Sequence, residues 1–308
     1  MKGMAKSAAE EGVGLVKDAI LIAGPTASGK SALALDLAER HDGIVVNADS
    51  MQVYSILDLL TARPGPAELA RARHELYGHI HPSRSYSTGA WLRDVGRLAG
   101  SGAFEGKVPI FVGGTGLYFR ALIDGLSEMP EIPAEIRNRW REELAQSGAE
   151  RLHCLLLEKD RESGEAVRAS DGQRIVRALE VLEASGRSIR AWQAERGTPL
   201  VDRSSARFFV IRPNRRVLVK RIDDRFDRMI EHGALAEVTE LAALKLPPSL
   251  PAMKAIGFRE LHAALDGRMD MAEAIERAKI ATRQYAKRQT TWFRHQLGPE
   301  WREPDPAH

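Results

Sequence analysis

Residues 24–31 read Gly-Pro-Thr-Ala-Ser-Gly-Lys-Ser, and no other stretch constrains the fold of this chain as strongly. The apolar run at 19–23 before it predicts a buried strand, and residues 32–39 after it have the pattern of a helix. Glycines let the turn bend so that its N–H groups converge where the helix N-terminus adds partial positive charge. The pattern therefore predicts a P-loop, in which Lys30 holds a di- or triphosphate and Ser31 offers a hydroxyl to Mg²⁺.

Composition limits the class of protein. The chain of 308 residues has room for one large or two ordinary domains, and its single cysteine excludes a disulfide framework. A net charge of +3 is compatible with nucleic acid but does not demand it. No apolar run approaches membrane-spanning length, and residues 1–17 lack the apolar core of a signal peptide. We therefore expect a cytoplasmic protein with no membrane contact.

The second predicted strand ends in an acid. Residues 43–48, Gly-Ile-Val-Val-Asn-Ala, predict a strand, and Asp49 follows them. Acids at the carboxyl ends of parallel strands point into the ligand crevice of such sheets. Asp49 could hold Mg²⁺ through water or act as a general base, but an aspartate is also common in turns and helix caps. The position alone leaves these alternatives open.

The third predicted strand, residues 107–112, runs into the turn Gly113-Gly-Thr-Gly116. No acid follows this strand, which makes Asp49 the better candidate for the magnesium site or the base. Thr115 could face the crevice or cap the helix predicted at 117–123. A further helix is predicted at 87–98, with Thr88 as its possible cap.

The sequence between the strands changes character after residue 126. Strand signals disappear until 206–212, and helices are predicted at 133–148, 150–159, 173–184 and 188–196. We predict an α/β protein: a P-loop NTPase-like core with a parallel sheet flanked by helices at 18–126 and 206–298, plus an all-helical insertion domain at 127–205. Residues 1–17 and 299–308 are interpreted as tails.

Two helices carry clustered cations. Arg221, Arg225 and Arg228 lie on one stripe of a predicted helix, where they could clamp a diphosphate or pair with the nearby Asp223, Asp224 and Asp227. The last helix, from 271 to 296, interleaves cations with aromatic residues, which suits phosphate contacts and base stacking; an ordinary amphipathic helix is the alternative. The residues concerned are Lys279, Arg283, Tyr285, Lys287, Arg288, Trp292, Phe293 and Arg294.

His79 and His81 have the spacing of two possible metal ligands. No further ligands lie nearby in the sequence, so solvated or core histidines are favoured.

An ordered series of motifs between residues 19 and 297 resembles the tRNA dimethylallyltransferases, also called tRNA isopentenyltransferases. The motifs are Gly24-Pro-Thr-Ala-Ser-Gly-Lys-Ser31, Asp49-Ser-Met-Gln-Val-Tyr54, Thr61-Ala-Arg-Pro64, Val112-Gly-Gly-Thr-Gly-Leu-Tyr118, Gln173-Arg-Ile-Val-Arg-Ala-Leu-Glu180, Arg221-Ile-x-x-Arg225-Phe, Ala255-Ile-Gly257 and Thr282-Arg-Gln-x-Ala-Lys-Arg-Gln-x-x-Trp-Phe-Arg294.

The resemblance implies transfer of a dimethylallyl group from dimethylallyl diphosphate to the exocyclic amine of the adenine 3′-adjacent to the anticodon in tRNA. It implies that Arg225 stabilises the leaving diphosphate, that Asp49 accepts the proton of the amine, and that Thr115 lines the channel in which base and isoprenoid meet. Ser31 would help place Mg²⁺ as the cofactor. The nucleotide- or diphosphate-binding residues would be Gly24, Pro25, Thr26, Ala27, Ser28, Gly29, Lys30 and Ser31.

The resemblance also implies that the helical insertion grips the tRNA anticodon stem-loop and that the protein works as a monomer. The positions that match tRNA-contacting residues of the family are Asp49, Ser50, Met51, Gln52, Thr115, Arg137, Gln173, Arg174, Ile175, Val176, Arg177, Lys254, Gly257, Phe258, Arg259, Lys287, Arg288, Trp292 and Arg294.

The chain departs from the family pattern at several positions in the loop after Asp49. Ile56 and Leu60 stand where glycines are common, and Arg63 stands where lysine is usual. Phe258 replaces the usual tyrosine, and Gly172 stands where proline is common. These departures concern the geometry of the loop and some tRNA contacts, but they leave the P-loop, Asp49, Thr115 and Arg225 untouched.

Three other functions remain open from the sequence. A small-molecule kinase or an isopentenyltransferase for free adenine nucleotides would need the P-loop, but neither obviously needs the basic aromatic helix at 279–294. An RNA-binding module that uses a nucleoside triphosphate as a switch would leave Asp49 and Thr115 without a shared task.

Overall fold

The computed structural model describes residues 15–195 and 197–304, and the chain divides into two compact units. The core unit comprises the chain up to Ile123 and from Pro199 onward, and the helical unit comprises Asp124–Thr198. The helical unit ends earlier than the residue 205 that we expected. Leu200 and Val201 already belong to the core unit, because both donate backbone hydrogen bonds to the Leu122 carbonyl (2.9 and 3.1 Å).

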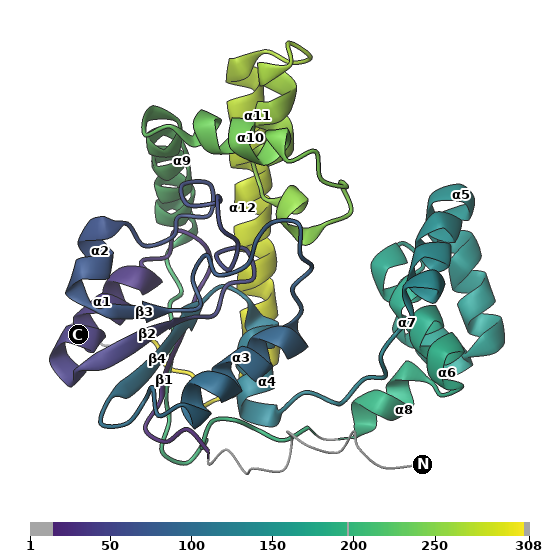
Figure 1. The fold of residues 1–308 in the computed structure, drawn as a ribbon, viewed down its shortest axis with the longest axis horizontal. Coiled ribbons are helices and arrows are strands. Elements are labelled where there is room, and N and C mark those ends of the chain that lie inside the picture. The colour runs from purple at the N-terminus through teal and green to yellow at the C-terminus, as the bar shows by residue number, and fades with distance from the viewer. Residues whose placement is uncertain (1–14, 196, 305–308) are drawn as a thin grey trace, which may run out of the picture. The chain divides into compact units, whose positions relative to one another are not determined.

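Five parallel strands form the centre of the core unit (Figure 1). They are β1 (Ile20–Ala23), β2 (Gly43–Asn47), β3 (Arg73–Glu75), β4 (Val108–Gly113) and β5 (Arg207–Val210), in the order β3-β2-β4-β1-β5. Leu21 lies opposite Phe111 on one side and Phe208 on the other. The sequence did not predict β3, because this three-residue edge strand is polar. The order places the ends of β1, β4 and β2 side by side at one edge of the sheet, where parallel sheets bind ligands.

Alternation of side chains along the strands explains the two covered faces. Ile20 and Ile22 point to helix α1 (Lys30–His41), while Leu21 and Ala23 point to α3 (Thr88–Gly100) and α4 (Gly116–Asp124). Both faces are apolar, as expected for a parallel sheet buried on both sides. The cap of α3 is Ser87, whose side chain accepts from Ala90 N, so the prediction of Thr88 was wrong by one residue.

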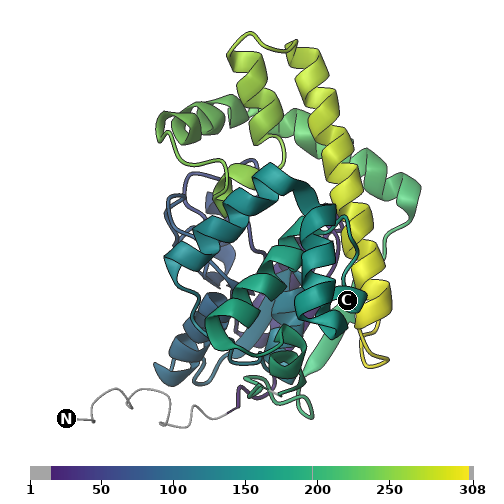
Figure 2. The same cartoon turned by 90° about the vertical axis from the view of Figure 1, so that its right-hand side faces the viewer.

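A second core lies among five further helices of the core unit: α9 (Arg215–Glu231), α10 (Ala234–Ala243), the 3₁₀ helix Pro251–Lys254, α11 (Phe258–Leu265) and α12 (Met271–Gln296). The short helix α2 (Pro66–Arg71) has no buried residue and does not belong to this core. Tyr54 and Leu57, from the loop after β2, are fully buried against residues of α9–α12. Figures 1 and 2 show α12 as one long helix that extends from the α10–α11 pair to the sheet. The loop after Asp49 is thereby fixed to the helices as well as to the sheet.

The helical unit has its own small core. Its helices are α5 (Ala134–Lys159), α6 (Arg161–Ala166), α7 (Gly172–Ser185) and α8 (Ile189–Ala194). Gly148 interrupts α5 with a φ of 78°, at the position where the sequence predicted a helix to end. Leu152, Leu156, Ile175 and Leu179 form the buried contact between α5 and α7. No strand occurs in the described residues of this unit.

The interpretation of residues 299–308 as a tail was wrong for the part that the structure describes. Trp301 is buried, with its ring 5.4 Å from that of Phe119 and 5.3 Å from that of Phe208. Arg302 pairs with the free edge of β5 through hydrogen bonds to Phe208 and Val210 (3.1 and 2.9 Å). At the other end, Val16 is buried and pairs with Val201, while residues 1–14 lie outside the described part. An exposed strand edge and an apolar ring together explain why this segment is ordered.

No helix in the described part of the chain is both long and apolar enough to cross a membrane.

Candidate active site: a P-loop joined to an apolar pocket

The P-loop places its turn directly before the N-terminus of α1. Gly29 adopts a φ of 97°, which lets the chain turn directly into the helix, and no side chain in the described part of the chain caps the first turn. The helix therefore begins with free N–H groups and the positive end of its dipole. Lys30 folds back so that its Nζ donates to the Pro25 carbonyl at 3.4 Å. An anion is the natural partner for these groups.

Gln289 ties the P-loop to the neighbouring turn. This buried residue of α12 accepts from Thr26 N through Oε1 and donates to the Gly114 carbonyl through Nε2, both at 2.9 Å. Our sequence reasoning missed it. A signal existed, because Gln289 stands on the buried stripe of the helix together with Ala278, Thr282, Ala286 and Phe293. A polar residue on such a stripe needs a partner.

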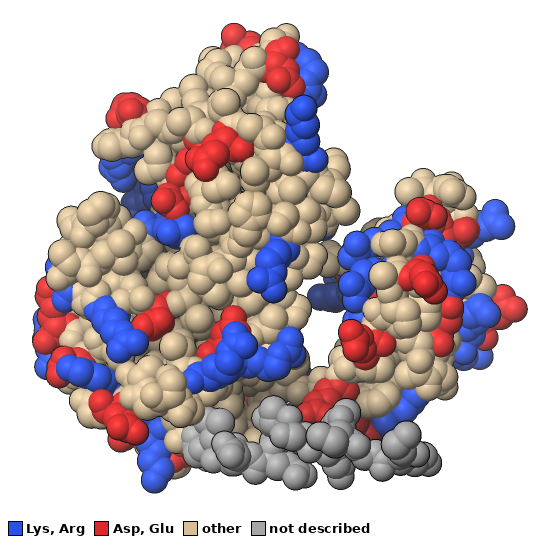
Figure 3. Space-filling view, in the orientation of Figure 1, with Lys and Arg blue, Asp and Glu red and all other residues tan. Residues whose placement is uncertain are grey.

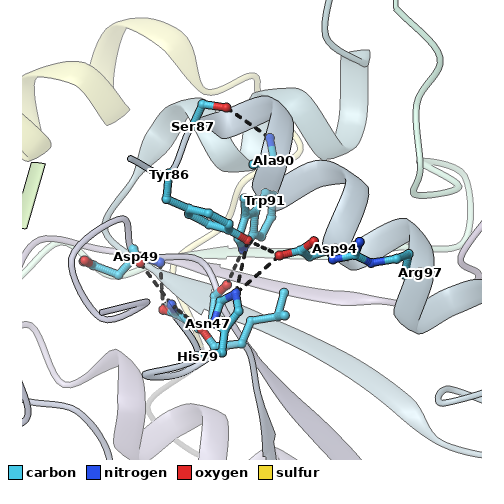
Figure 4. A network of polar contacts seen from close by, with 10 residues as sticks. Asn47, Asp49, His79, Tyr86, Ser87, Ala90, Trp91, Asp94 and Arg97 are labelled. Atoms are coloured by element: carbon cyan, nitrogen blue, oxygen red, sulfur yellow. Dashed lines mark hydrogen bonds and ion pairs between the residues drawn. The ribbon is translucent and has the colours of Figure 1, made fainter. Parts of the chain in front are cut away.

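Asp49 is held by Asn47 in a tight turn. Asp49 N donates to Asn47 Oδ1 at 2.8 Å, and Asn47 Nδ2 donates to the Asp49 carbonyl at 3.0 Å. Trp91 in turn donates to the Asn47 carbonyl at 2.8 Å (Figure 4). One carboxylate oxygen, Oδ1, accepts from Met51 N at 2.9 Å. Within the described residues Oδ2 accepts no hydrogen bond, so the turn role and a chemical role coexist in one side chain.

His79 does not belong to this site. It contacts Tyr86 and Asp94, both at 3.3 Å, and Asp94 also pairs with Arg97. None of these residues contacts Asp49 in Figure 4. His81 bonds Ser83 instead, and the described residues contain no cluster of three or more His, Cys, Asp or Glu that could hold a metal ion.

Thr115 joins the turn after β4 to the turn after β2. Its Oγ1 accepts from Ser50 N at 2.9 Å and lies 3.3 Å from Ser50 Oγ, so the side chain does not cap α4. The glycines around it are required by close approach. A Cβ on Gly113 would lie 2.0 Å from the Ala48 carbonyl oxygen, and one on Gly116 would lie 2.1 Å from the Trp292 ring. The turn can therefore hold Thr115 against Ser50 only with glycine on either side.

Helix α9 supplies two cations to the P-loop. Arg225 donates to Thr26 Oγ1, and Arg221 donates to the Ser28 carbonyl at 3.3 Å. The aspartates of α9 pair with other cations: Asp223 with Arg283, Asp224 with Lys220 and Asp227 with Lys279, each at 2.7 Å. The alternative that these acids neutralise Arg221 and Arg225 is therefore wrong for this structure.

Lys30 and Arg225, two cations that interact with Asp49, have lowered pKa values. Burial lowers the pKa of Lys30 to about 8; the Asp49 carboxylate opposes this effect and Arg225 adds to it. Burial also lowers the pKa of Arg225 to about 10, again opposed by Asp49. Both pKa values are lowered for the same reason, because a cation surrounded by protein atoms loses hydration. An incoming polyanion would restore the favourable environment for both charges.

A pocket opens between this cationic group and the second core. Thr26, Asp49 and Arg225 provide its polar lining. Apolar residues from the loop after Asp49, from α9 and from the segment before α11 line it as well, and the sequence did not predict this wall. The apolar lining is Met51, Leu60, Ile222, Phe226, Met229, Ala255 and Ile256, with Thr61, Thr282 and Tyr285 completing the pocket. It suits a molecule with an anionic head and a short hydrocarbon tail.

Comparison with known proteins decides the family. The family model described as IPP transferase matches residues 52–296, and one described as isopentenyl transferase matches residues 17–84. The chain belongs to the tRNA isopentenyltransferase (dimethylallyltransferase) family. It is 65% identical to the tRNA dimethylallyltransferase of Mesorhizobium japonicum over all of this chain and 95% of that protein, and 56% identical to that of Rhizobium meliloti over 94% and 96%.

Solved structures of the isopentenyltransferase family have the same fold. The tRNA isopentenylpyrophosphate transferase of Bacillus halodurans is 30% identical, with a TM-score of 0.66 over 94% of this chain and 92% of that one. A eukaryotic dimethylallyltransferase acting on tRNA is 28% identical, with a TM-score of 0.75 over 89% of this chain and 69% of that one.

The family's tRNA-contacting positions fall into two groups in the core unit. Asp49, Ser50, Met51 and Thr115 converge on the pocket rim, as the hydrogen bonds between their turns require. Lys287, Arg288 and Arg294 are exposed on α12 and form no ion pair within the described residues. Trp292, half-buried on the same helix, packs on Gly116. These residues remain predictions as RNA contacts, and their exposure is compatible with that role.

Other positions that match the isopentenyltransferase motifs serve the packing of the chain. Gln52 donates to the Thr61 and Ala62 carbonyls (2.9 and 2.8 Å), which closes the loop after Asp49. Phe258 is buried and stacks on His262, while Gly257 before it adopts a φ of 94°. The adjoining Lys254 and Arg259 are exposed.

Among the matching positions in the helical unit, some side chains are buried in its core and others are polar. Ile175 and Val176 are buried between α5 and α7, so their side chains stabilise the unit. Gln173, Arg174 and Arg177 lie on α7 with them; Arg174 pairs with Asp171 and Arg177 with Glu180. Arg137 bonds the Ile132 carbonyl at 3.3 Å. Figure 3 shows basic and acidic residues interspersed over this unit, which is not a uniformly basic surface.

Proposed function

We propose that this protein transfers the dimethylallyl group from dimethylallyl diphosphate to the exocyclic amine of the adenine 3′-adjacent to the anticodon in tRNA, with release of diphosphate. The observation that carries the proposal is the pocket, which has Arg225 and Thr26 in its polar lining and Leu60 and Phe226 in its apolar lining. Its chemistry matches a diphosphate with a five-carbon tail. The relatives named tRNA dimethylallyltransferase support the same activity.

The P-loop would hold the diphosphate both before and after the allylic C–O bond breaks. Negative charge grows on the leaving oxygen as this bond breaks. Lys30, Arg225 and the N–H groups at the start of α1 would stabilise that charge. Because Gln289 and Thr26 fix the loop to its neighbours, little reorganisation is needed during the reaction.

Asp49 would accept the proton of the adenine amine as the new C–N bond forms. The amine is a weak nucleophile because its lone pair is delocalised into the ring, so a positioned base is needed. Asn47 fixes the backbone of Asp49, and Met51 N bonds Oδ1 of its carboxylate and leaves Oδ2 available. Thr115 and Ser50 would line the path of the base, which must leave its stack to reach the pocket.

Mg²⁺ is the proposed cofactor, and the residues present fit it. This ion keeps several waters and binds through one or two protein oxygens together with substrate phosphates. The Ser31 hydroxyl is exposed on the first turn of α1, and Asp49 is the nearest acid identified for the site. Bound there, Mg²⁺ would neutralise part of the charge on the diphosphate. Ser31 and Asp49 would hold the ion directly or through water.

We further propose that the exposed cations of α12, together with the helical unit, bind the anticodon stem-loop of tRNA. We also propose that the protein acts as a monomer. Lys287, Arg288 and Arg294 have no competing acid among the described residues, and Trp292 lies beside them. Cations next to an aromatic ring suit a single-stranded loop, whose phosphates and unstacked bases are both accessible.

One experiment separates this function from its rivals. The protein is mixed with labelled dimethylallyl diphosphate and Mg²⁺, and either bulk tRNA or AMP is offered as acceptor. Label in tRNA, in the nucleoside next to the anticodon, is the expected result. Label in AMP alone would identify an isopentenyltransferase of free nucleotides. No transfer to either acceptor would favour a small-molecule kinase or an RNA-binding nucleotide switch.

A further inference from the structure

One wall of the pocket is a loop with unusual backbone geometry. Leu60 and Thr61 line the pocket from the segment between Ile56 and Arg63. Ile56 has a φ of 74° and Ala62 a φ of 53°. A β-branched residue such as isoleucine disfavours this left-handed region strongly. Other contacts must therefore hold the loop in its observed path.

The carboxylate of Glu237, on α10, supplies such contacts. Oε1 accepts from Asp58 N and Leu59 N, and Oε2 accepts from Leu60 N, with the first and third bonds at 2.9 and 3.0 Å. Helix α10 is itself fixed, because Val238 and Leu241 are fully buried in the second core. Three consecutive backbone donors thus converge on one half-buried anion, which anchors the middle of the loop.

The ends of the loop have separate anchors. Arg63 donates to the Tyr54 carbonyl at 3.0 Å and pairs with Asp58, while Gln52 holds the Thr61 and Ala62 carbonyls. Leu57 is fully buried. Loss of the Glu237 carboxylate would therefore not unfold the loop. It would leave the N–H groups of Asp58, Leu59 and Leu60 without this acceptor.

Leu60 reaches the apolar part of the pocket wall near Phe226 and Gly257. A Cβ built on Gly257 would lie 3.5 Å from Leu60 Cδ2 and 3.2 Å from the Phe226 ring. Leu60 and Phe226, which both line the pocket, thus approach the same point of the backbone. A small retreat of Leu60 would lengthen the space available to a hydrocarbon tail.

We propose that Glu237 is a positioning residue for substrate selection: it clamps the loop so that Leu60 closes the pocket behind a five-carbon chain and excludes longer prenyl chains. This inference rests on the proposed function, since it assumes that the tail of a prenyl diphosphate occupies the pocket. Glu237 acts through the backbone of residues 58–60 and does not touch the substrate.

The test compares the binding of dimethylallyl and geranyl diphosphate by calorimetry in the wild type and in Glu237→Gln. The amide keeps the size of the side chain but places a donor opposite Leu60 N. We expect the affinity ratio to move toward geranyl diphosphate by about tenfold, the scale on which an apolar pocket discriminates by chain length. The ratio of two affinities does not depend on the folded fraction, so a purely structural role would leave it unchanged.

Matched variants complete the design. Glu240→Gln alters an exposed glutamate of the same helix and should leave the ratio unchanged. Leu60→Ala should shift the ratio in the same direction as Glu237→Gln. Ile56→Gly removes the backbone strain, so adding Glu237→Gln to it should shift the ratio less than Glu237→Gln does alone.

Hydrogen exchange at the amides of residues 58–60 gives a readout that needs no substrate. We expect faster exchange in Glu237→Gln than in wild type or Glu240→Gln. An unchanged affinity ratio or unchanged exchange would overturn the inference. Failure of the wild type to modify tRNA would instead overturn the proposed function, and the binding ratio would still decide the role of Glu237.

Discussion

At the scale of single residues, the proposed chemistry depends on the different roles of the two carboxylate oxygens of Asp49. Oδ1 is occupied by Met51 N, and Asn47 fixes the backbone on both sides. The sequence could place Asp49 at the end of a strand, but it could not choose between a turn and a base. The structure shows that the turn uses one oxygen only. It also shows the role of Gln289, a position of the last motif, whose side chain joins two backbone segments.

Asp49→Asn should separate binding from chemistry. The amide keeps the size and the hydrogen bond from Met51 N, but it cannot accept a proton. We expect the single-turnover rate with saturating tRNA and dimethylallyl diphosphate to fall by about 10²–10⁴-fold, the usual contribution of a positioned base. tRNA affinity should change much less. Rescue by high Mg²⁺, or weaker diphosphate binding, would instead assign Asp49 to the metal.

The lowered pKa of Lys30 predicts how diphosphate binding responds to pH. Lys30 loses its proton above about pH 8 in the free protein, while Arg225, with a pKa of about 10, stays charged. Affinity should therefore fall as pH rises above 8, by about tenfold per pH unit, until it reaches that of Lys30→Ala. Titrations of dimethylallyl diphosphate from pH 6.5 to about 9.5 would measure this slope. The Lys30→Ala variant should be nearly flat over the same range, and a parallel decline in both would contradict the assignment.

At the scale of elements, α12 has two faces with different tasks. Lys279 and Arg283, which the sequence grouped with the RNA-facing cations, instead pair with Asp227 and Asp223 of α9. The sequence could not predict this pairing, because the partners are 52 and 60 residues away and meet only after α9 packs on α12. The end of α12 beyond Lys287 keeps its cations exposed. The bounds of α12 were predicted correctly, whereas the cap predicted for α3 was wrong by one residue.

Charge removal at this exposed end should weaken tRNA binding in a salt-dependent way. For Lys287→Ala with Arg288→Ala, each lost phosphate contact should reduce the slope of log affinity against log salt by about one unit. Dimethylallyl diphosphate binding should stay as in wild type. The matched control is Arg277→Ala, an exposed arginine near the other end of α12 that pairs with Glu273. If the double variant behaves like this control, the end of α12 is structural only.

At the scale of the whole molecule, the helical unit is inserted into a continuous core through two adjacent connections. Leu122 accepts from Leu200 and Val201 on the core side, and Ser127 donates to the Glu195 carbonyl at 2.8 Å on the other side. The loss of strand signals predicted such an insertion. Its ends were less predictable, because 199–205 forms no helix or strand and belongs to the core through backbone hydrogen bonds and the burial of Val201.

Excision of the helical unit should separate the two binding activities that we propose. A Cβ on Gly125 would lie 2.3 Å from the carbonyl carbon of Gly197, so the chain can be rejoined there with little strain after removal of the residues between them. The excised protein should bind dimethylallyl diphosphate within about threefold of wild type, because every pocket residue lies in the core unit. Its affinity for tRNA should fall at least about tenfold with a shallower salt slope, since phosphate contacts are lost. Lys30→Ala in the full chain should have the opposite effect: it should weaken the binding of dimethylallyl diphosphate and leave the affinity for tRNA near that of wild type. Wild-type tRNA affinity in the excised protein would show that the core, through α12, binds the anticodon stem-loop alone.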